Sequence, residues 1–199
     1  MSARLAWGGA IGPAAFVAAW SISAAATDRD DYSPVHDTIS QLAAVGANTR
    51  PLMTTGMIVF GLALPVYAVA LKQTLPGRAW LAATASGVAT LGVAATPLHH
   101  SELVDRLHEI CAAAGYITLT AVPLLARRPL RTMGHRKLAA FGTAVAAVSA
   151  VALPTSVLVS QTGFFQRLGL TAGDAFLIAS APVIGSILRR RETKVPGVS

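Results

Sequence analysis

The chain has 199 residues, of which 53% are hydrophobic and 13% are charged, and one soluble core cannot bury that much apolar surface. The composition therefore excludes an ordinary soluble domain and predicts an integral membrane protein. A net charge of +7 would suggest nucleic acid in a soluble protein, but basic residues that cluster between apolar segments indicate membrane orientation. We expect no nucleic-acid partner.

Six apolar segments long enough to cross a bilayer follow one another along the chain. They cover residues 5–26, 52–71, 79–97, 107–126, 138–160 and 168–188. The connections are too short for a separate domain, so we expect a single all-α membrane domain over residues 1–199, a bundle of six transmembrane helices. The first segment exceeds the usual apolar core of a signal peptide, which favours a retained helix over a cleaved one.

Lys and Arg residues divide unevenly between alternate connections. Twelve lie on the side of both termini, and this set is Arg4, Lys72, Arg78, Arg127, Arg128, Arg131, Arg136, Lys137, Arg189, Arg190, Arg191 and Lys194. Four lie on the other side, namely Arg29, Arg50, Arg106 and Arg167. By the positive-inside rule, this predicts a multi-pass protein of the cell membrane with both termini in the cytoplasm.

The connection after the first segment contains signals for a short helix. Ser33 is a suitable N-cap, Pro34 suits the first helical position and Gly46 suits the stop. Three apolar side chains at spacings of four and three share one face: Val35, Ile39 and Leu42. We expect an amphipathic helix over residues 34–45 at the outer interface.

Four polar side chains flank the apolar face of that predicted helix. They are His36, Asp37, Ser40 and Gln41. We take His36 and Asp37 as candidate catalytic residues and Ser40 and Gln41 as candidate binding residues.

A second polar group opens the fourth segment. If Ser101 caps this helix, one broad face carries Glu102, Asp105, His108 and Glu109. The last two residues would enter the apolar zone, where an ionisable side chain costs on the order of 3 kcal/mol and usually has a partner. This predicts His108 and Glu109 as catalytic residues and Asp105 as a binding residue.

Asp174 repeats the pattern in the sixth segment. It lies about 9 Å below the predicted outer end of that helix at 1.5 Å per residue. A carboxylate at that depth needs a partner, and Arg167, His108 or a metal ion are candidates. The same residues could instead form a buried ion pair that only holds helices together.

Several chemistries could use this cluster. His99, His100 and His108 could bind a divalent metal such as zinc and activate a water molecule, although their spacing is not diagnostic. Alternatively, Asp174 or Glu109 could act as a general acid or base on a lipid. Proton-coupled transport fits less well because the cluster is confined to one side, and haem would need paired histidines on facing helices.

The stretch from Tyr32 to Leu42 reads YSPVHDTISQL. It resembles a family of prokaryotic membrane proteins catalogued as domain of unknown function number 998, and the likeness continues through His108 and through Gln166, Arg167 and Leu168. The resemblance implies six helices, with this block just after the first. It also implies a set of positions of interest: Ser33, Pro34, Ile39, Ser40, His108 and Arg167.

The resemblance leads us to expect an acid after the Ile-Ser pair, and Gln41 stands there instead. This departure weakens any mechanism that needs a carboxylate at that point. The family brings no assigned reaction, so the resemblance does not choose between functions.

Two hypotheses of different class follow. The first is an enzyme that acts on a lipid or lipid-linked substrate from the outer leaflet, with His108 and Asp174 as the catalytic or ligand pair and with Arg167 among the binding residues. The second is a non-catalytic membrane module that binds a lipid or a partner protein. The sequence indicates no oligomeric state.

Overall fold

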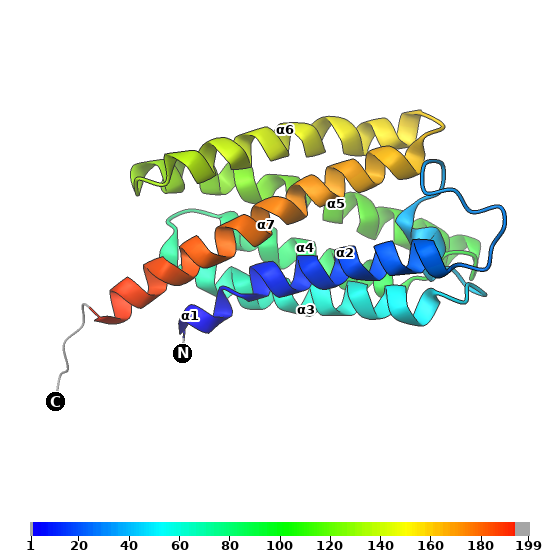
Figure 1. The fold of residues 1–199 in the computed structure, drawn as a ribbon, viewed down its shortest axis with the longest axis horizontal. Coiled ribbons are helices and arrows are strands. Elements are labelled where there is room, and N and C mark those ends of the chain that lie inside the picture. Colours follow the sequence, from blue (N-terminus) through cyan, green and yellow to red (C-terminus); the bar gives the residue numbers. More distant parts are fainter. Residues whose placement is uncertain (1, 194–199) are drawn as a thin grey trace.

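The computed structural model describes residues 2–193, and every regular element in that range is helical. Six long helices run back and forth along one axis and form an elongated bundle (Figure 1). These are α2 (Gly8–Ala26), α3 (Arg50–Thr74), α4 (Ala79–Ala95), α5 (Glu102–Thr132), α6 (Arg136–Leu158) and α7 (Thr162–Thr193). Two short elements complete the described chain, namely α1 (Ser2–Leu5) and the 3₁₀ helix η1 (Ile39–Ala43).

Five stretches are long and apolar enough to cross a membrane: residues 3–26, which take in α1 and α2, and the helices α3, α5, α6 and α7. The sixth helix, α4, is apolar but has 17 residues, or about 25 Å at 1.5 Å per residue. That length is somewhat below the ~30 Å of a hydrocarbon core. The structure confirms an all-helical fold over residues 2–193, with several helices long and apolar enough to span a membrane, and the number of crossings stays a prediction.

Four helices begin earlier than their apolar runs predicted, α3 and α6 by two residues, α5 by five and α7 by six. Helix α5 begins at Glu102 because the Ser101 side chain accepts a hydrogen bond from the Val104 backbone N–H at 3.3 Å. Helix α7 begins at Thr162 instead of Leu168. Asp174 is twelve residues after that start, so it lies about 18 Å along the helix and not 9 Å.

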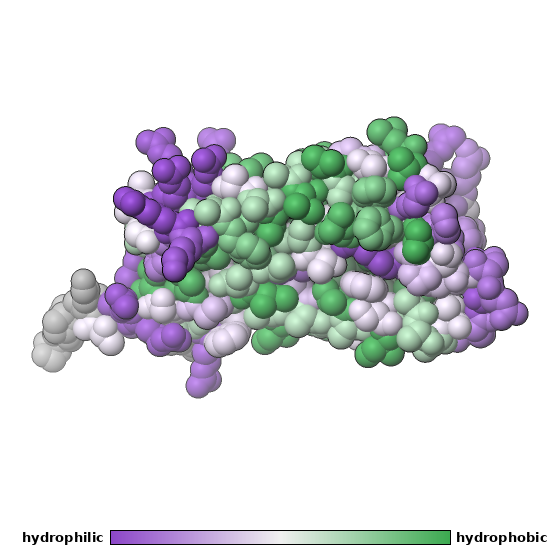
Figure 2. Space-filling view, turned by 45° about the horizontal axis from the view of Figure 1, so that its top comes forward, coloured by the Kyte–Doolittle hydropathy of each residue, from purple (hydrophilic) through white to green (hydrophobic). Residues whose placement is uncertain are grey.

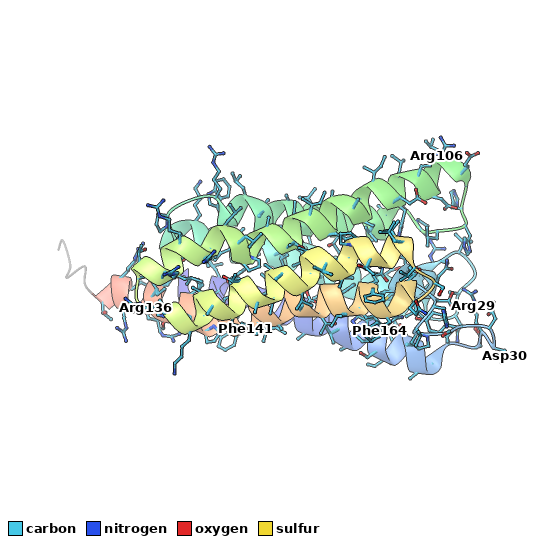
Figure 3. All side chains as sticks on the ribbon, turned by 90° about the horizontal axis from the view of Figure 1, so that it is seen from above. Arg29, Asp30, Arg106, Arg136, Phe141 and Phe164 are labelled. Atoms are coloured by element: carbon cyan, nitrogen blue, oxygen red, sulfur yellow. The ribbon has the colours of Figure 1, made fainter. Side chains whose placement is uncertain are left out.

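Hydrophilic side chains gather at the two ends of the bundle and leave a largely hydrophobic belt between them (Figure 2). We call the end with the α3–α4 and α5–α6 connections the termini end, because α2 begins and α7 finishes there (Figure 1). The opposite end, with the connections 27–49, 96–101 and 159–161, is the loop end. Figure 3 shows Arg136 at the termini end and Arg29, Asp30 and Arg106 at the loop end. Of the twelve basic residues sorted to the termini side, Lys194 lies outside the described residues.

The segment predicted as a helix over 34–45 has a different structure. The N–H groups of His36 and Asp37 both donate to the Ser33 carbonyl, which closes one turn. Thr38 is then extended, and the chain continues as the five residues of η1. Ile39 and Leu42 are 2% and 1% exposed, so this part of the segment is inserted into the bundle and is not an amphipathic surface helix.

Close helix packing positions these elements. At the α3–α4 contact, a Cβ on Gly87 would lie 2.7 Å from the Gly61 carbonyl oxygen. Only glycine permits that approach, as is usual where helices pack in lipid. The buried interior behind it contains Leu64, Tyr67 and Phe176.

Candidate functional site

Residues 32–43, which we call the cap segment, close the loop end of the bundle, and Arg167 holds them there. The Arg167 side chain comes from the second turn of α7, and its Nη1 donates to the carbonyls of Pro34 at 2.7 Å, Asp37 at 2.9 Å and Gly163 at 3.0 Å. Three carbonyl acceptors around one guanidinium nitrogen fix the course of the chain. The Arg167 side chain is thus hydrogen bonded to backbone groups of the cap segment.

Two aromatic side chains also contact this guanidinium. Its Nη2 donates to the Tyr32 hydroxyl, and its central carbon lies 5.5 Å from the centre of the Trp20 ring. Burial raises the pKa of the Tyr32 phenol, and the nearby Arg167 charge offsets this only in part. Tyr32 therefore stays neutral at physiological pH and can serve as the acceptor.

Close approach of the cap segment to α7 depends on Gly163. A Cβ at this position would lie 2.2 Å from the Asp37 carbonyl oxygen and 2.6 Å from that of Pro34. No side chain fits at those distances. The Phe164 N–H also donates to the Val35 carbonyl at 2.9 Å, which adds a direct backbone link.

The predicted catalytic residues His36 and Asp37 make local contacts in the cap segment. The His36 Nδ1 is 3.0 Å from the Ser160 carbonyl oxygen, and the imidazole is exposed. The Asp37 carboxylate accepts a hydrogen bond from the Ser33 backbone N–H at 2.7 Å. The predicted binding residue Gln41 receives a long 3.5 Å hydrogen bond from Arg29.

His108 is buried on α5 and bridges two other elements. Its Nδ1 lies 2.6 Å from the Thr96 carbonyl oxygen, and its Nε2 lies 2.9 Å from the Ser40 Oγ. Because a carbonyl can only accept, Nδ1 must carry the proton, and the neutral ring then presents a bare Nε2. We therefore assign the Ser40 hydroxyl as the donor to His108.

Gln166 connects the cap segment, α7 and α5. Its side-chain oxygen accepts the Ile39 backbone N–H at 2.7 Å, and its side-chain nitrogen donates to the Tyr116 hydroxyl. Gln166 and Tyr116 were not among the predicted site residues. One signal was available, since Gln166, Leu170 and Asp174 follow at a spacing of four and share one face of α7.

A cavity lies inside the bundle next to the cap segment, between α2, η1, α3, α4, α5 and α7. The cavity volume is about 50 Å³, which is room for a few water molecules. Most of its wall is apolar. Its polar side chains are Ser40, Ser86, Thr90, Tyr116, Gln166 and Asp174.

Asp174 is 1% exposed and lines this cavity, and neither carboxyl oxygen has a hydrogen-bond partner among residues 2–193. The predicted partners are engaged elsewhere, Arg167 with carbonyls and His108 with Ser40 and Thr96. The expected direct pairing of Asp174 with either residue was therefore wrong. The structure does bring Asp174 and the Ser40 hydroxyl to the same cavity.

The predicted metal ligands do not come together. Within the described chain, no group of three or more His, Cys, Asp or Glu side chains could hold a metal ion. His99 and His100 are exposed in the α4–α5 connection, whereas His108 is buried between α5 and the cap segment. The predicted set of His99, His100 and His108 is therefore not a metal site in this fold.

The other two predicted residues of α5 lie outside the cavity. Asp105 accepts a hydrogen bond from the His99 backbone N–H at 2.9 Å and so shapes the α4–α5 connection. Glu109 is exposed and is not part of the cavity wall. Its neighbour His108 points inward, because successive residues of a helix face different directions.

The sequence model of the family described as "Protein of unknown function (DUF998)" matches residues 10–182, so the chain belongs to this family. No curated protein and no solved structure matches the chain.

Proposed function

We propose that this DUF998 protein is a six-pass protein of the cell membrane, with both termini in the cytoplasm, that binds part of a lipid or lipid-linked substrate in the Asp174 cavity. Two features support its placement in the membrane: the apolar belt seen in Figure 2 and the excess of Lys and Arg at the termini end. In this orientation, the loop end and its cap segment face outward.

The observation that carries the proposal is the isolated carboxyl group of Asp174. Burial of a polar group without a partner costs free energy, and an unpaired buried charge costs far more. A ligand that donates a hydrogen bond or carries a positive charge would remove that cost. Because most of the cavity wall is apolar, the same ligand should also have an apolar part, as lipids with hydroxyl, amide or amine groups do.

The cavity sits where such a ligand would be found. Asp174 is about 18 Å from the first residue of α7, at the depth of acyl chains. The Ser40 and Gln166 side chains lie closer to the loop end, at the level where a lipid changes from apolar chain to polar headgroup. The acyl chain of a lipid would thus contact the apolar wall, and the groups near its headgroup would lie beside the Ser40 and Gln166 side chains.

Two matched substitutions on α5 test binding in the cavity. Ala112 lines the cavity, whereas Ala114 is exposed on the same helix. We expect a specific lipid to copurify with the wild-type protein and with Ala114→Leu, and to be lost from Ala112→Leu, because the leucine would fill the cavity. Mass spectrometry of lipids extracted after purification in detergent measures the amount per protein.

The same experiment has clear adverse outcomes. If no lipid copurifies with the wild type, or if Ala112→Leu and Ala114→Leu retain equal amounts, the cavity is not a lipid site. Circular dichroism of each variant checks that the bundle is intact.

Labelling from outside intact cells tests the orientation. In a Cys111→Ala background, a membrane-impermeant maleimide should label Asp30→Cys at the loop end and should leave Thr132→Cys at the termini end unlabelled until the cells are lysed. Both positions are exposed. The reverse labelling pattern would overturn the assignment of the loop end to the outside.

A further inference from the structure

The Ser40 hydroxyl lies in the wall of the Asp174 cavity and is hydrogen bonded to His108. It is the only described hydroxyl of the cavity that an imidazole contacts, since the other serine and threonine there, Ser86 and Thr90, have no such neighbour. Ser40 thus differs in its chemistry from the other hydroxyl side chains of the wall.

The Ser40–His108 pair has the geometry of an activated serine. The Oγ and Nε2 are 2.9 Å apart, within the range that a general base needs. The Thr96 carbonyl, 2.6 Å from Nδ1, fixes the ring and its tautomer, as a third group does in serine hydrolases. A backbone carbonyl orients the ring here in place of a carboxylate.

We propose that Ser40 is a nucleophile that accepts an acyl group from a lipid ester, with His108 as its general base. This inference rests on the proposed function, because the lipid must reach the cavity for the ester to meet Ser40. The proposed function requires only that a lipid binds in the cavity, and it does not require acyl transfer.

The step balances within the residues present. The Ser40 Oγ attacks the ester carbonyl carbon, and its proton passes to His108 Nε2. The resulting tetrahedral intermediate then expels the alcohol oxygen, which takes that proton from Nε2. An acyl group is left on Ser40, and a water molecule or a second alcohol releases it through the same base.

Tyr116 is placed to stabilise the oxyanion of that intermediate. The orientation of the Gln166 amide is fixed by the Ile39 N–H, so its nitrogen faces Tyr116 and donates to the phenol oxygen. In the described part of the chain, the phenol hydrogen has no acceptor of its own, and Tyr116 lines the cavity. This leaves one O–H donor in the cavity for developing negative charge.

The depth of the pair suits an ester. His108 lies six residues into α5 from its loop-end start, or about 9 Å. A bilayer of ~40–45 Å has a hydrocarbon core of ~30 Å, so its polar boundary is about 5–8 Å thick on each side, and an α5 that begins at the outer surface places His108 just below the inner edge of this boundary. Acyl ester groups of lipids lie at that boundary, which favours an ester over the headgroup phosphate as the reacting group.

Covalent labelling tests the nucleophile without knowledge of the natural substrate. The purified protein in lipid nanodiscs is treated with a long-chain alkyl fluorophosphonate, and the modified peptide is identified by mass spectrometry. We expect one phosphonyl adduct on Ser40, absent from Ser40→Ala and unchanged in Ser156→Ala, a buried serine outside the cavity. His108→Gln keeps a hydrogen-bond acceptor for Ser40 but removes the base, so labelling should slow at least tenfold. Tyr116→Phe should slow it less.

The outcomes separate this inference from the proposed function. Three outcomes would each overturn the assignment of Ser40 as a nucleophile with His108 as its base. They are absence of an adduct on the wild-type protein, equal labelling of Ser40→Ala, and an unchanged labelling rate in a folded His108→Gln. If lipid still copurifies in those cases, binding stands and only the acyl transfer fails. If Ser40 is labelled but no lipid copurifies and Ala112→Leu has no effect, the lipid-binding proposal fails instead.

Discussion

Arg167 and Asp174 lie seven residues apart on α7, and both are buried, yet their surroundings are opposite. Arg167 donates to three backbone carbonyls and to Tyr32, and only its Nε lacks a partner. Asp174 has no partner for either oxygen in the described chain. A buried charged residue can therefore be hydrogen bonded to several backbone groups in one turn of a helix, while another residue two turns later has no partner in the described chain.

The surrounding space explains the difference. Around Arg167 the backbone of the cap segment is packed so tightly that Gly163 has no room for a Cβ. Around Asp174 there is a cavity, and the Gln166 amide nitrogen, a donor from the same cavity wall, is turned toward Tyr116. Removal of the two charges should therefore change stability in opposite directions.

The largest effect is expected for Arg167→Met, which keeps the length of the side chain but leaves the Pro34 and Asp37 carbonyls without their donor. Both hydrogen bonds are partly buried, and an acceptor that loses its partner away from water costs about 1–3 kcal/mol, so the free energy of unfolding should fall by about 3 kcal/mol. Denaturant unfolding in detergent, followed by circular dichroism, measures it.

Arg106→Met is the matched control for this change. Arg106 forms an exposed pair with Glu102 at the start of α5, and exposed pairs contribute little. An equal loss of stability in both variants would show that Arg167 is not a special link between α7 and the cap segment.

A smaller effect is expected for Gly163→Ala. The new methyl group would meet the Asp37 carbonyl oxygen at 2.2 Å, and so the cap segment must move away from α7. Overpacking of this kind costs roughly 1–3 kcal/mol. Thermal unfolding gives the size of the loss, and faster hydrogen exchange at the Phe164 and Ile39 amides would locate it in the cap contact.

Gly115→Ala is the corresponding control on α5. The nearest atom to a Cβ there is 3.8 Å away, which is an ordinary contact. Alanine should instead gain up to about 1 kcal/mol of helix propensity. If Gly163→Ala is as stable as Gly115→Ala, the tight closure of the cap segment is not needed for the fold.

The sequence predicted the helices well where apolar runs or a capping residue defined them. The start of α5 followed once Ser101 was taken as its cap, which the structure confirms, whereas the start of α7 was missed because Thr162 precedes the apolar window. The cap segment was missed for a different reason. Its residues are held by long-range contacts to Arg167 and Gln166, which override the local helix signals of Ser33 and Pro34.

For the site, the sequence identified single residues but not their partners. His108 and Asp174 were predicted from side-chain type and depth, Ser40 from its place beside the apolar face of the predicted loop helix, and Arg167 as a candidate partner of Asp174. Their actual partners are mostly backbone carbonyls, such as Thr96 for His108, and no side-chain pattern marks a carbonyl. A side-chain partner for Asp174 was expected because a buried carboxylate usually has one. In the structure Asp174 faces a cavity instead, and no sequence pattern predicts a cavity.

The smallest change in stability is expected for Asp174→Leu, and it should have the opposite sign to that of Arg167→Met. An apolar side chain in a mostly apolar cavity removes an unpaired polar group, so protein stripped of lipid should gain about 1 kcal/mol in its free energy of unfolding.

When the copurifying lipid is added back, the wild type should gain stability through binding, and Asp174→Leu should not. Ser86→Ala, another buried polar residue of the same wall, should respond to lipid as the wild type does. Unfolding with and without lipid measures both changes. A loss of stability in lipid-free Asp174→Leu would mean that this carboxyl group is structural, and the contrast with Arg167 would then disappear.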